Sequence, residues 1–573
     1  MNEYEIFYFD VLVIGSGGAG LRSAIAAKES GAKTAVVCKS LLGKAHTIMA
    51  EGGIAAALAH VDAKDSWQAH FKDTLFGGKY VNDWRMAMIH AQESPEAVRE
   101  LERWGAIFDR TEDGRILQRP FGGHAYSRLC HVGDRTGLEM IRTLQDKTVT
   151  LDIDLFTECI ITRLFVQDGT VVGAFGFWKN TGKAVVFMAK TVILATGGIG
   201  RIWRITSNSW DSTAGGYALA YEAGAQLKDM EFVQFHPTGM VWPPGVKGLL
   251  VTEAVRGEGG LLKNKLGERF MKKYDPKRME LSTRDVVARA INQEVKEGRG
   301  TEHGGVFLDI SHKPAAYIKS KLPSMYQQFM EFADVDITKE PMEVGPTCHY
   351  AMGGVKVHPE TQESTISGLF AAGEVAAGLH GGNRLGGNSL SDLLVFGKRA
   401  GCAAAEYAAR VKGFASFDKA KLDICQDELI SPFGGGRNEN PSLLHADLQE
   451  LMETHVGIIR NGEALMEASQ VLMTLKDRYK HVGAIGDPRY NFGWHLCLSL
   501  KFMLTVAQII TRAAFERKES RSSHARDDFP KSDPEWGKKS VIIKQNNGAL
   551  EFSTEPLPVM PPDIRKLVED DPR

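Results

Sequence analysis

Clustered cysteines, an excess of one charge and long apolar runs are all missing from this sequence. The seven cysteines, at positions 38, 130, 159, 348, 402, 425 and 497, form no Cys-x-x-Cys pair and no cluster. This spacing argues against a zinc site, an iron–sulfur cluster or a disulfide framework, and it predicts a protein kept in a reducing compartment. Any one-electron relay would therefore belong to another polypeptide.

Positive and negative charges nearly cancel, because 69 Lys and Arg stand against 71 Asp and Glu for a formal net charge of −2. That balance gives no reason to expect nucleic acid or an anionic membrane as the main partner. No apolar run reaches the roughly 18 residues of a membrane-spanning helix. A strand expected at 9–14 begins too early for a cleavable leader, so we expect neither a spanning segment nor a leader.

Glycine is abundant instead, and many of the 60 glycines follow apolar segments. In DVLVIGSGGAGLRSAIAAKESGAKTAVVCK, the motif Gly15-x-Gly17-x-x-Gly20 separates a strand from an expected helix at 19–30 and a second strand at 34–38. In such a βαβ unit the first glycine allows a tight turn, the second admits a pyrophosphate and the third lets the helix pack on the strand. The free N–H groups of the helix N-terminus face the phosphates, so this segment predicts a dinucleotide-binding domain.

The identity of the dinucleotide and the domain order follow from later segments. An acidic residue often ends the second strand and binds a ribose hydroxyl, but Lys39-Ser40 stands there, which weakens the NAD interpretation. Two more strand-then-glycine units, at 191–201 and 366–374, predict a nucleotide-binding domain interrupted by an insertion. We therefore expect an α/β Rossmann-like domain with an inserted α+β capping domain, followed by a helical domain and a C-terminal segment. The expected boundaries are 1–235 and 348–415 for the two parts of the nucleotide-binding domain, 236–347 for the cap, 416–535 for the helical domain and 536–573 for an irregular closing segment.

Seven segments then match one known family, in order, over nearly the whole chain. They are HTIMAEGG at 46–53, FVQFHPTG at 232–239, TEAVRGEGG at 252–260, RDVVAR at 284–289, PTCHYAMGG at 346–354, HGGNRLGGNSL at 380–390 and RKESRSSHARDDFP at 517–530. Together they resemble the flavoprotein subunit of succinate dehydrogenase and fumarate reductase. The resemblance implies FAD as the cofactor and a four-carbon dicarboxylate, succinate or fumarate, as the substrate.

The resemblance also implies a covalent bond from a ring nitrogen of His46 to the 8α-methyl carbon of the flavin. Such a bond would retain the cofactor and make the flavin a stronger oxidant, as the unactivated CH₂–CH₂ bond of succinate demands. No metal ligand is expected. The FAD-binding residues implied are Gly15, Gly17, Gly18, Gly20, Lys39, Ser40, His46, Thr47, Gly52, Gly53, Glu374, Ser389 and Leu390.

Two pairs of side chains would hold the dicarboxylate. The resemblance implies that His349 and Arg384 bind one carboxylate, and that His236 and Thr252 bind the other. The planar guanidinium of arginine suits this role because it grips a carboxylate with two hydrogen bonds. The two ends together would present the central carbons for hydride transfer.

Proton transfer is implied to run through Arg284, supplied by Glu253 and Arg256. Glu253 and Arg256 are three residues apart, so on one helical turn they share a face. Arginine is effectively never deprotonated, so we suppose a concerted handover in which Arg284 gives its proton as Glu253 returns one. Arg289, five residues further on, is the rival donor.

Two positions depart from the family's usual pattern. Ala214-Gly215-Gly216 stands where the family usually has Gly-Asp-Gly, so a carboxylate contact to the cofactor is missing there. Ser522 stands where the family usually has glycine after Glu-Ser-Arg. Both departures concern cofactor packing and leave the substrate residues unchanged.

Partners follow from the missing cluster ligands and from the resemblance. They imply a membrane anchor where quinone reacts and a separate iron–sulfur subunit, with this soluble chain held peripherally at the cytoplasmic face of the inner or plasma membrane. Two alternatives stay open: a soluble enzyme such as L-aspartate oxidase or a soluble fumarate reductase with unlinked FAD, and a non-enzymatic flavin carrier without a substrate. The physiological direction also stays open, because both directions use the same residues.

Overall fold

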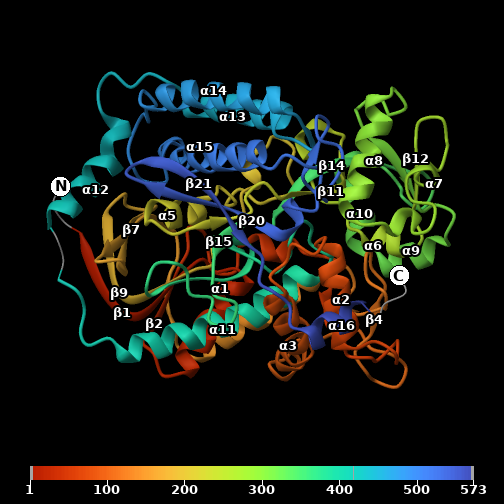
Figure 1. Cartoon of the computed structure of the whole chain (residues 1–573), viewed down its shortest axis with the longest axis horizontal. Helices are drawn as coiled ribbons and strands as arrows, with labels where there is room; N and C mark the ends of the chain where they lie inside the picture. The colour runs from red at the N-terminus through yellow and green to blue at the C-terminus, as the bar shows by residue number, and fades with distance from the viewer. Residues whose placement is uncertain (1–3, 417–418, 570–573) are drawn as a thin grey trace.

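The nucleotide-binding fold is built on a seven-stranded sheet (Figure 1). The structure is a computed structural model that describes residues 4–416 and 419–569. The parts of the expected domains at 1–3, 417–418 and 570–573 lie outside the described residues. The strands β2, β1, β9 and β16 pair in parallel, whereas β8 and β7 extend the sheet as an antiparallel edge. The order is β6 (Asp154–Phe156), β2 (Thr34–Val37), β1 (Glu5–Ile14), β9 (Ala184–Leu194), β8 (Thr170–Trp178) and β7 (Cys159–Gln167), with β16 (Leu369–Ala371) beside β9.

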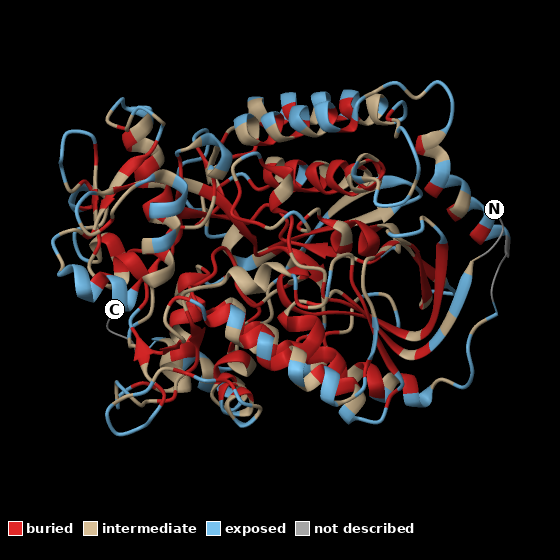
Figure 2. Cartoon of the chain, turned by 180° about the vertical axis from the view of Figure 1, so that it is seen from behind, coloured by how far each residue is buried: buried red, intermediate tan, exposed pale blue. Residues whose placement is uncertain are grey.

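Helices cover both faces of this sheet (Figure 1). On one face α1 (Gly18–Glu29) packs against α11 (Asn388–Arg410), and small buried side chains such as Ala24 and Ala404 let the two helices approach closely. Around them lie α2 (Trp67–Gly77), α3 (Trp84–Arg103) and α4 (Thr136–Thr150). The other face carries α5 (Gly215–Glu222). Figure 2 shows the strands and the inner sides of these helices as buried.

A second sheet with its own core forms the insertion. The antiparallel strands β11 (Val233–Met240), β14 (Met342–Ala351), β13 (Val306–Asp309) and β12 (Leu261–Lys263) pack with five helices over buried residues such as Val287, Leu308 and Phe329. The strands β11 and β14 are also the two connections to the nucleotide-binding domain, so the cap is mounted directly on residues of the site. Its helices are α6 (Ala254–Gly257), α7 (Met271–Tyr274), α8 (Arg284–Lys296), α9 (Ala315–Lys321) and α10 (Pro323–Ala333).

The helical domain comprises α12 (Lys419–Ile430), α13 (Pro441–His455), α14 (Gly462–Tyr479) and α15 (Phe492–Glu516). Among the described residues, α15 is the one helix long and apolar enough to cross a membrane by length and composition. Its apolar window is 61% buried, and it packs against α13, α14 and α5. Most of its apolar window is thus packed inside the protein, as in a core helix.

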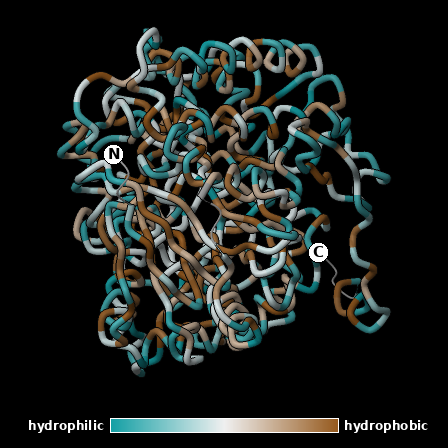
Figure 3. The backbone as a smooth tube through the Cα atoms, turned by 90° about the vertical axis from the view of Figure 1, so that its left-hand side faces the viewer, coloured by the Kyte–Doolittle hydropathy of each residue, from teal (hydrophilic) through white to brown (hydrophobic). Residues whose placement is uncertain are grey.

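The closing segment is not irregular, so this expectation was wrong. β20 (Lys539–Asn546) and β21 (Ala549–Pro556) form a hairpin, and β20 also pairs with β10 (Leu227–Lys228). Asn547-Gly548 makes the turn with both φ angles positive, which is the backbone that two-residue hairpins prefer. Figure 3 shows the chain then running down the outside of the body to α16 (Pro562–Glu569), which packs against α2.

The expected fold class is confirmed in its main parts: a Rossmann-like domain, a capping insertion and a C-terminal helical domain. The expected βαβ unit at 9–38 is present as β1, α1 and β2. The remaining short strands are β3 (Ile54–Ala55), β4 (Gln118–Arg119), β5 (Leu129–Cys130), β15 (Gly354–Lys356), β17 (Ala376–Ala377), β18 (Ile459–Arg460) and β19 (Ala525–Arg526).

Candidate active site

A single cavity extends from the turn after β1 to the cap domain. It opens at the carboxyl ends of β1 and β9, where doubly wound sheets bind their ligands. Two expected site residues, Gly20 and Arg256, do not line it and lie behind its wall. The expected residues that line it are Gly15, Gly17, Gly18, Lys39, Ser40, His46, Thr47, Gly52, Gly53, His236, Thr252, Glu253, Arg284, His349, Glu374, Arg384, Ser389 and Leu390.

The turn between β1 and α1 has the geometry of a phosphate cradle. Gly15 has a φ of +117°, and a Cβ there would lie 2.2 Å from the carbonyl oxygen of Ala195. A Cβ on Gly20 would lie 1.9 Å from the carbonyl oxygen of Gly15, so only glycine lets the helix start this close to the strand. The Gly18 N–H donates to Thr47 Oγ1 at 3.3 Å, which ties the turn to the segment that carries His46.

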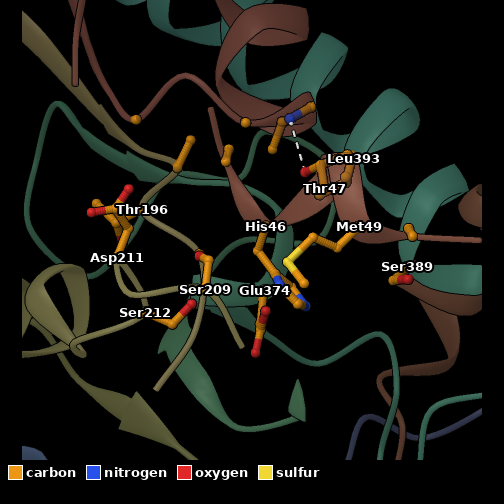
Figure 4. A pocket seen from close by; sticks show the side chains of 18 of the residues that line it. His46, Thr47, Met49, Thr196, Ser209, Asp211, Ser212, Glu374, Ser389 and Leu393 are labelled. Atoms are coloured by element: carbon orange, nitrogen blue, oxygen red, sulfur yellow. Dashed lines mark hydrogen bonds between the residues drawn. The ribbon is translucent and has the colours of Figure 1, made fainter. Parts of the chain in front are cut away.

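His46 begins a short 3₁₀ helix, His46–Met49, and its ring lines the middle of the cavity. Its buried Nδ1 has no hydrogen-bond partner among the described residues. Burial, and then the charges of Arg384 and Arg201, lower the pKa of His46 to about 4, so the imidazole is neutral at physiological pH. Figure 4 shows the side chains of His46 and Glu374 converging on the same space. A neutral ring with an unpaired nitrogen fits a covalent attachment point for a flavin.

Three further residues, His349, His236 and Arg384, line the end of the cavity next to the cap. The His349 ring lies 5.2 Å from that of His236, and burial lowers both pKa values well below the usual range. Ser207 Oγ lies 2.7 Å from His349 Nδ1, and the guanidinium of Arg384 lies 4.3 Å above the Tyr350 ring. Burial, and then the nearby charge of Arg284, lower the pKa of Arg384. The positive charge at this end is therefore carried by Arg384 and the nearby Arg284, and together with the neutral imidazoles, which can donate hydrogen bonds, it favours a bound dianion.

Arg284, Glu253 and Arg256 form a buried chain beside that end. Arg284 Nε donates to Glu253 Oε2 at 2.9 Å, and Arg256 Nη2 lies 3.6 Å from the same oxygen. Burial raises the pKa of Glu253, but the charges of Arg256 and Arg284 outweigh it and hold that pKa below its usual value. The three residues are thus connected in the order that a proton relay needs, with Arg284 at the cavity and Arg256 behind it.

Arg289 lies elsewhere, although it is on the same helix. Its guanidinium donates to the Ser522 carbonyl oxygen and to Asp285 Oδ2, the latter at 3.2 Å, and it does not line the cavity. Ser522 itself has a φ of +53°, which is why a glycine suits this position. Ala214 is likewise left-handed, with a φ of +63°, at the start of α5. Both departures from the family pattern therefore replace glycine at positions where glycine is the less strained residue.

Sequence reasoning missed Gln234, which joins the two arginines of the site. Its Oε1 accepts a hydrogen bond from Arg284 Nη1 and another from Arg384 Nη2, each at 3.1 Å. Its Nε2 donates to Asn383 Oδ1 at 2.6 Å. The signal was present, because Gln234 and His236 are two residues apart on β11 and so face the same side.

The family follows from comparison with known proteins. The FAD binding domain family matches residues 10–390, and the fumarate reductase flavoprotein C-terminal family matches residues 445–567. The succinate dehydrogenase flavoprotein subunit of Rickettsia felis is 38% identical over 97% of this chain and 96% of its own length. The chain belongs to the flavoprotein subunit family of succinate dehydrogenase and fumarate reductase. Within that family it carries the FAD-binding domain.

Other members of the family are similar over almost their whole length. Mycobacterium smegmatis Sdh1, solved in complex with UQ1, is 52% identical with a TM-score of 0.89, covering 98% of this chain and 96% of that one. The E. coli quinol fumarate reductase chain FrdA is 34% identical with a TM-score of 0.92, covering 97% and 98%. One subunit of the fumarate reductase (CoM/CoB) of Methanothermobacter marburgensis is 47% identical over 95% of this chain and 98% of its own length. The names of these relatives point to different electron partners.

Among the described residues, no group of three or more His, Cys, Asp or Glu side chains is placed to hold a metal ion. All seven cysteines are free thiols, and six of them are buried.

Proposed function

We propose that this chain interconverts succinate and fumarate on FAD, as the catalytic flavoprotein subunit of a succinate:quinone oxidoreductase. One observation carries the proposal: one cavity joins the glycine cradle and His46 to the cluster of His236, His349, Arg284 and Arg384. Family membership supports it independently.

In this proposal one set of residues binds the two carboxylates of the substrate and another transfers the proton. Arg384 and His349 hold one carboxylate of the substrate, and His236 with Thr252 holds the other, so both ends are fixed by donors. The flavin, when bound, supplies the hydride acceptor or donor. Arg284 holds the proton at its guanidinium: Nε is tied to Glu253 and Nη1 to Gln234, while Nη2 has no hydrogen-bond partner among the described residues. Glu253 receives or returns that proton through its 2.9 Å contact, with Arg256 stabilising its charge.

His46 is the proposed covalent anchor of FAD. After acid denaturation we expect flavin to remain on the precipitated wild-type protein, whereas His46→Ser should release all of it as free FAD. His349→Asn is the matched control, since it changes another histidine of the same cavity and should keep the flavin attached. Flavin fluorescence of washed pellets, followed by peptide mapping, measures the outcome. Free FAD from the wild-type protein would instead favour the unlinked alternatives, L-aspartate oxidase or a soluble fumarate reductase.

Two relatives suggest different electron partners. We infer an iron–sulfur subunit, a quinone-reactive membrane anchor and a peripheral position on the cytoplasmic side, and the 52% identity to a chain solved with UQ1 supports this. The 47% identity to a CoM/CoB-linked fumarate reductase supports the rival acceptor. The purified native complex should reduce a quinone analogue with succinate and show no fumarate reduction driven by CoM and CoB. The reverse pattern would replace the quinone link and leave the dicarboxylate chemistry intact.

A flavin carrier without a substrate is disfavoured by the site itself. A carrier has no use for the buried guanidinium of Arg384, which has no carboxylate partner among the described residues, because unpaired buried charge is costly. Arg384 makes its described hydrogen bonds to neutral oxygens, on Gln234 and on Ser389. Such an arrangement favours the binding of an anionic substrate.

A further inference from the structure

The adenosine end of the cavity lacks the acidic residue that usually follows the second strand. Lys39-Ser40 occupies that place, and an ammonium cannot accept a hydrogen bond from a ribose hydroxyl. Gly215, where the family pattern has a carboxylate, offers none either. A Cβ at Gly215 would meet only Phe502, at 3.7 Å, so the space is open and unfilled by another side chain.

Four acidic residues line the cavity in the described part of the chain, and three of them belong to its other end. Glu253 is bound to Arg284, and Glu374 accepts a hydrogen bond from the Ala351 N–H. Glu51 is hydrogen-bonded to Thr252. Asp211 alone stands at the end of β2, with Oδ1 4.0 Å from Lys39 Nζ.

Asp211 reaches this place on a short, internally bonded loop between residues 203 and 214. The Ser212 N–H donates to the Ser209 carbonyl and the Thr213 N–H to the Asp211 carbonyl, at 3.2 and 2.9 Å. Lys39 Nζ donates to Thr213 Oγ1 at 3.0 Å, which fixes the ammonium beside the loop. The Asp211 carboxylate itself accepts no hydrogen bond from a described residue and is 40% exposed to the cavity and solvent. Figure 4 shows it on the wall beside Thr196, away from His46.

We propose that Asp211 accepts a hydrogen bond from a hydroxyl of the adenosine ribose of FAD, with Lys39 orienting its carboxylate. The loop before α5 thus supplies the acid that is missing after β2 and at Gly215. This inference rests on the proposed FAD binding and adds a residue that no motif of the sequence marks.

The test compares FAD with FAD analogues lacking the 2′- or the 3′-hydroxyl of the adenosine ribose. It uses the full chain with His46→Ser, so that binding is reversible, and follows flavin fluorescence. Asp211→Asn should weaken FAD binding on the order of 10- to 100-fold, the range of a hydrogen bond to a charged group. It should leave the binding of one deoxy analogue and of FMN unchanged. Asp154→Asn, an exposed aspartate on the neighbouring strand β6, is the matched control and should bind FAD as the parent does.

Two results would overturn the inference while FAD binding stands. Equal losses for FAD and for both analogues would mean that Asp211 acts only by holding Lys39. A parent chain that binds FAD and both analogues equally would show that no ribose hydroxyl is recognised, even if Asp211→Asn does not fold. Failure of the Asp154→Asn control to bind FAD at all would contradict the proposed function, and this inference with it.

Discussion

Arg284→Ala is expected to abolish nearly all turnover in both directions while the protein keeps its flavin. Loss of a positioned proton donor costs roughly 10²- to 10⁴-fold in rate, or about 3 to 5 kcal/mol of transition-state stabilisation. The fold should survive, because Glu253 keeps Arg256 at 3.6 Å and the Gly122 N–H at 2.8 Å. Succinate oxidation with a dye acceptor and fumarate reduction with a reduced dye measure the effect, and absorbance measures the flavin.

Arg289→Ala is the matched control for this experiment. It removes an arginine from the same helix whose guanidinium binds Ser522 and Asp285 outside the cavity, so most of the activity should remain. A variant lacking Arg284 that still turns over at more than about a tenth of the wild-type rate would exclude it as the donor. Loss of activity in Arg289→Ala alone would transfer the role to its rival.

Arg384→Met should raise the KM for succinate and fumarate by roughly 100-fold or more. The substitution removes a two-pronged carboxylate grip, and each hydrogen bond to a charged group is worth about 1.5–3 kcal/mol. The free energy of unfolding should not fall by a comparable amount. The Arg384 side chain is buried close to Arg284, so its removal also removes the repulsion between two buried positive charges. Steady-state kinetics and thermal unfolding measure the two effects separately.

Arg384→Lys refines this prediction. Lysine keeps the charge but lacks the planar fork, so it should recover only part of the affinity. The affinity of dicarboxylate inhibitors should fall in parallel with that of the substrates in both variants. If Arg384→Met lowers kcat and leaves both KM and inhibitor binding unchanged, the proposed carboxylate contact is wrong.

The fold could be predicted where a sequence motif allows only one backbone conformation. Gly15 and Gly20 could not be other residues at that turn, so strand, helix and second strand followed from their spacing. The C-terminal hairpin was not predicted, although Asn547-Gly548 is typical of a hairpin turn. Apolar and polar side chains alternate only weakly along β21, and none of its residues is buried. An edge strand of this kind gains its stability from pairing with β20, which a local pattern does not reveal.

The site was predictable in part, for a similar reason. Glu253 and Arg256 were expected to share a face because helical spacing alone places them, and they contact at 3.6 Å. Asp211 is far in sequence from the end of β2, so only the folded structure shows that it lies beside Lys39. The choice between Arg284 and Arg289 also required the structure, since both stand on α8 and only their surroundings separate them.

Succinate–fumarate interconversion at this site can be tested by an anaerobic titration of the purified chain, without partner subunits, followed by flavin absorbance. If FAD and the dicarboxylate share the one cavity, succinate should bleach the oxidised flavin and fumarate should restore the colour, with L-aspartate having no effect. The Arg284→Ala chain should show neither change within the same time. A flavin that succinate leaves oxidised while L-aspartate reduces it would contradict succinate–fumarate interconversion in this cavity.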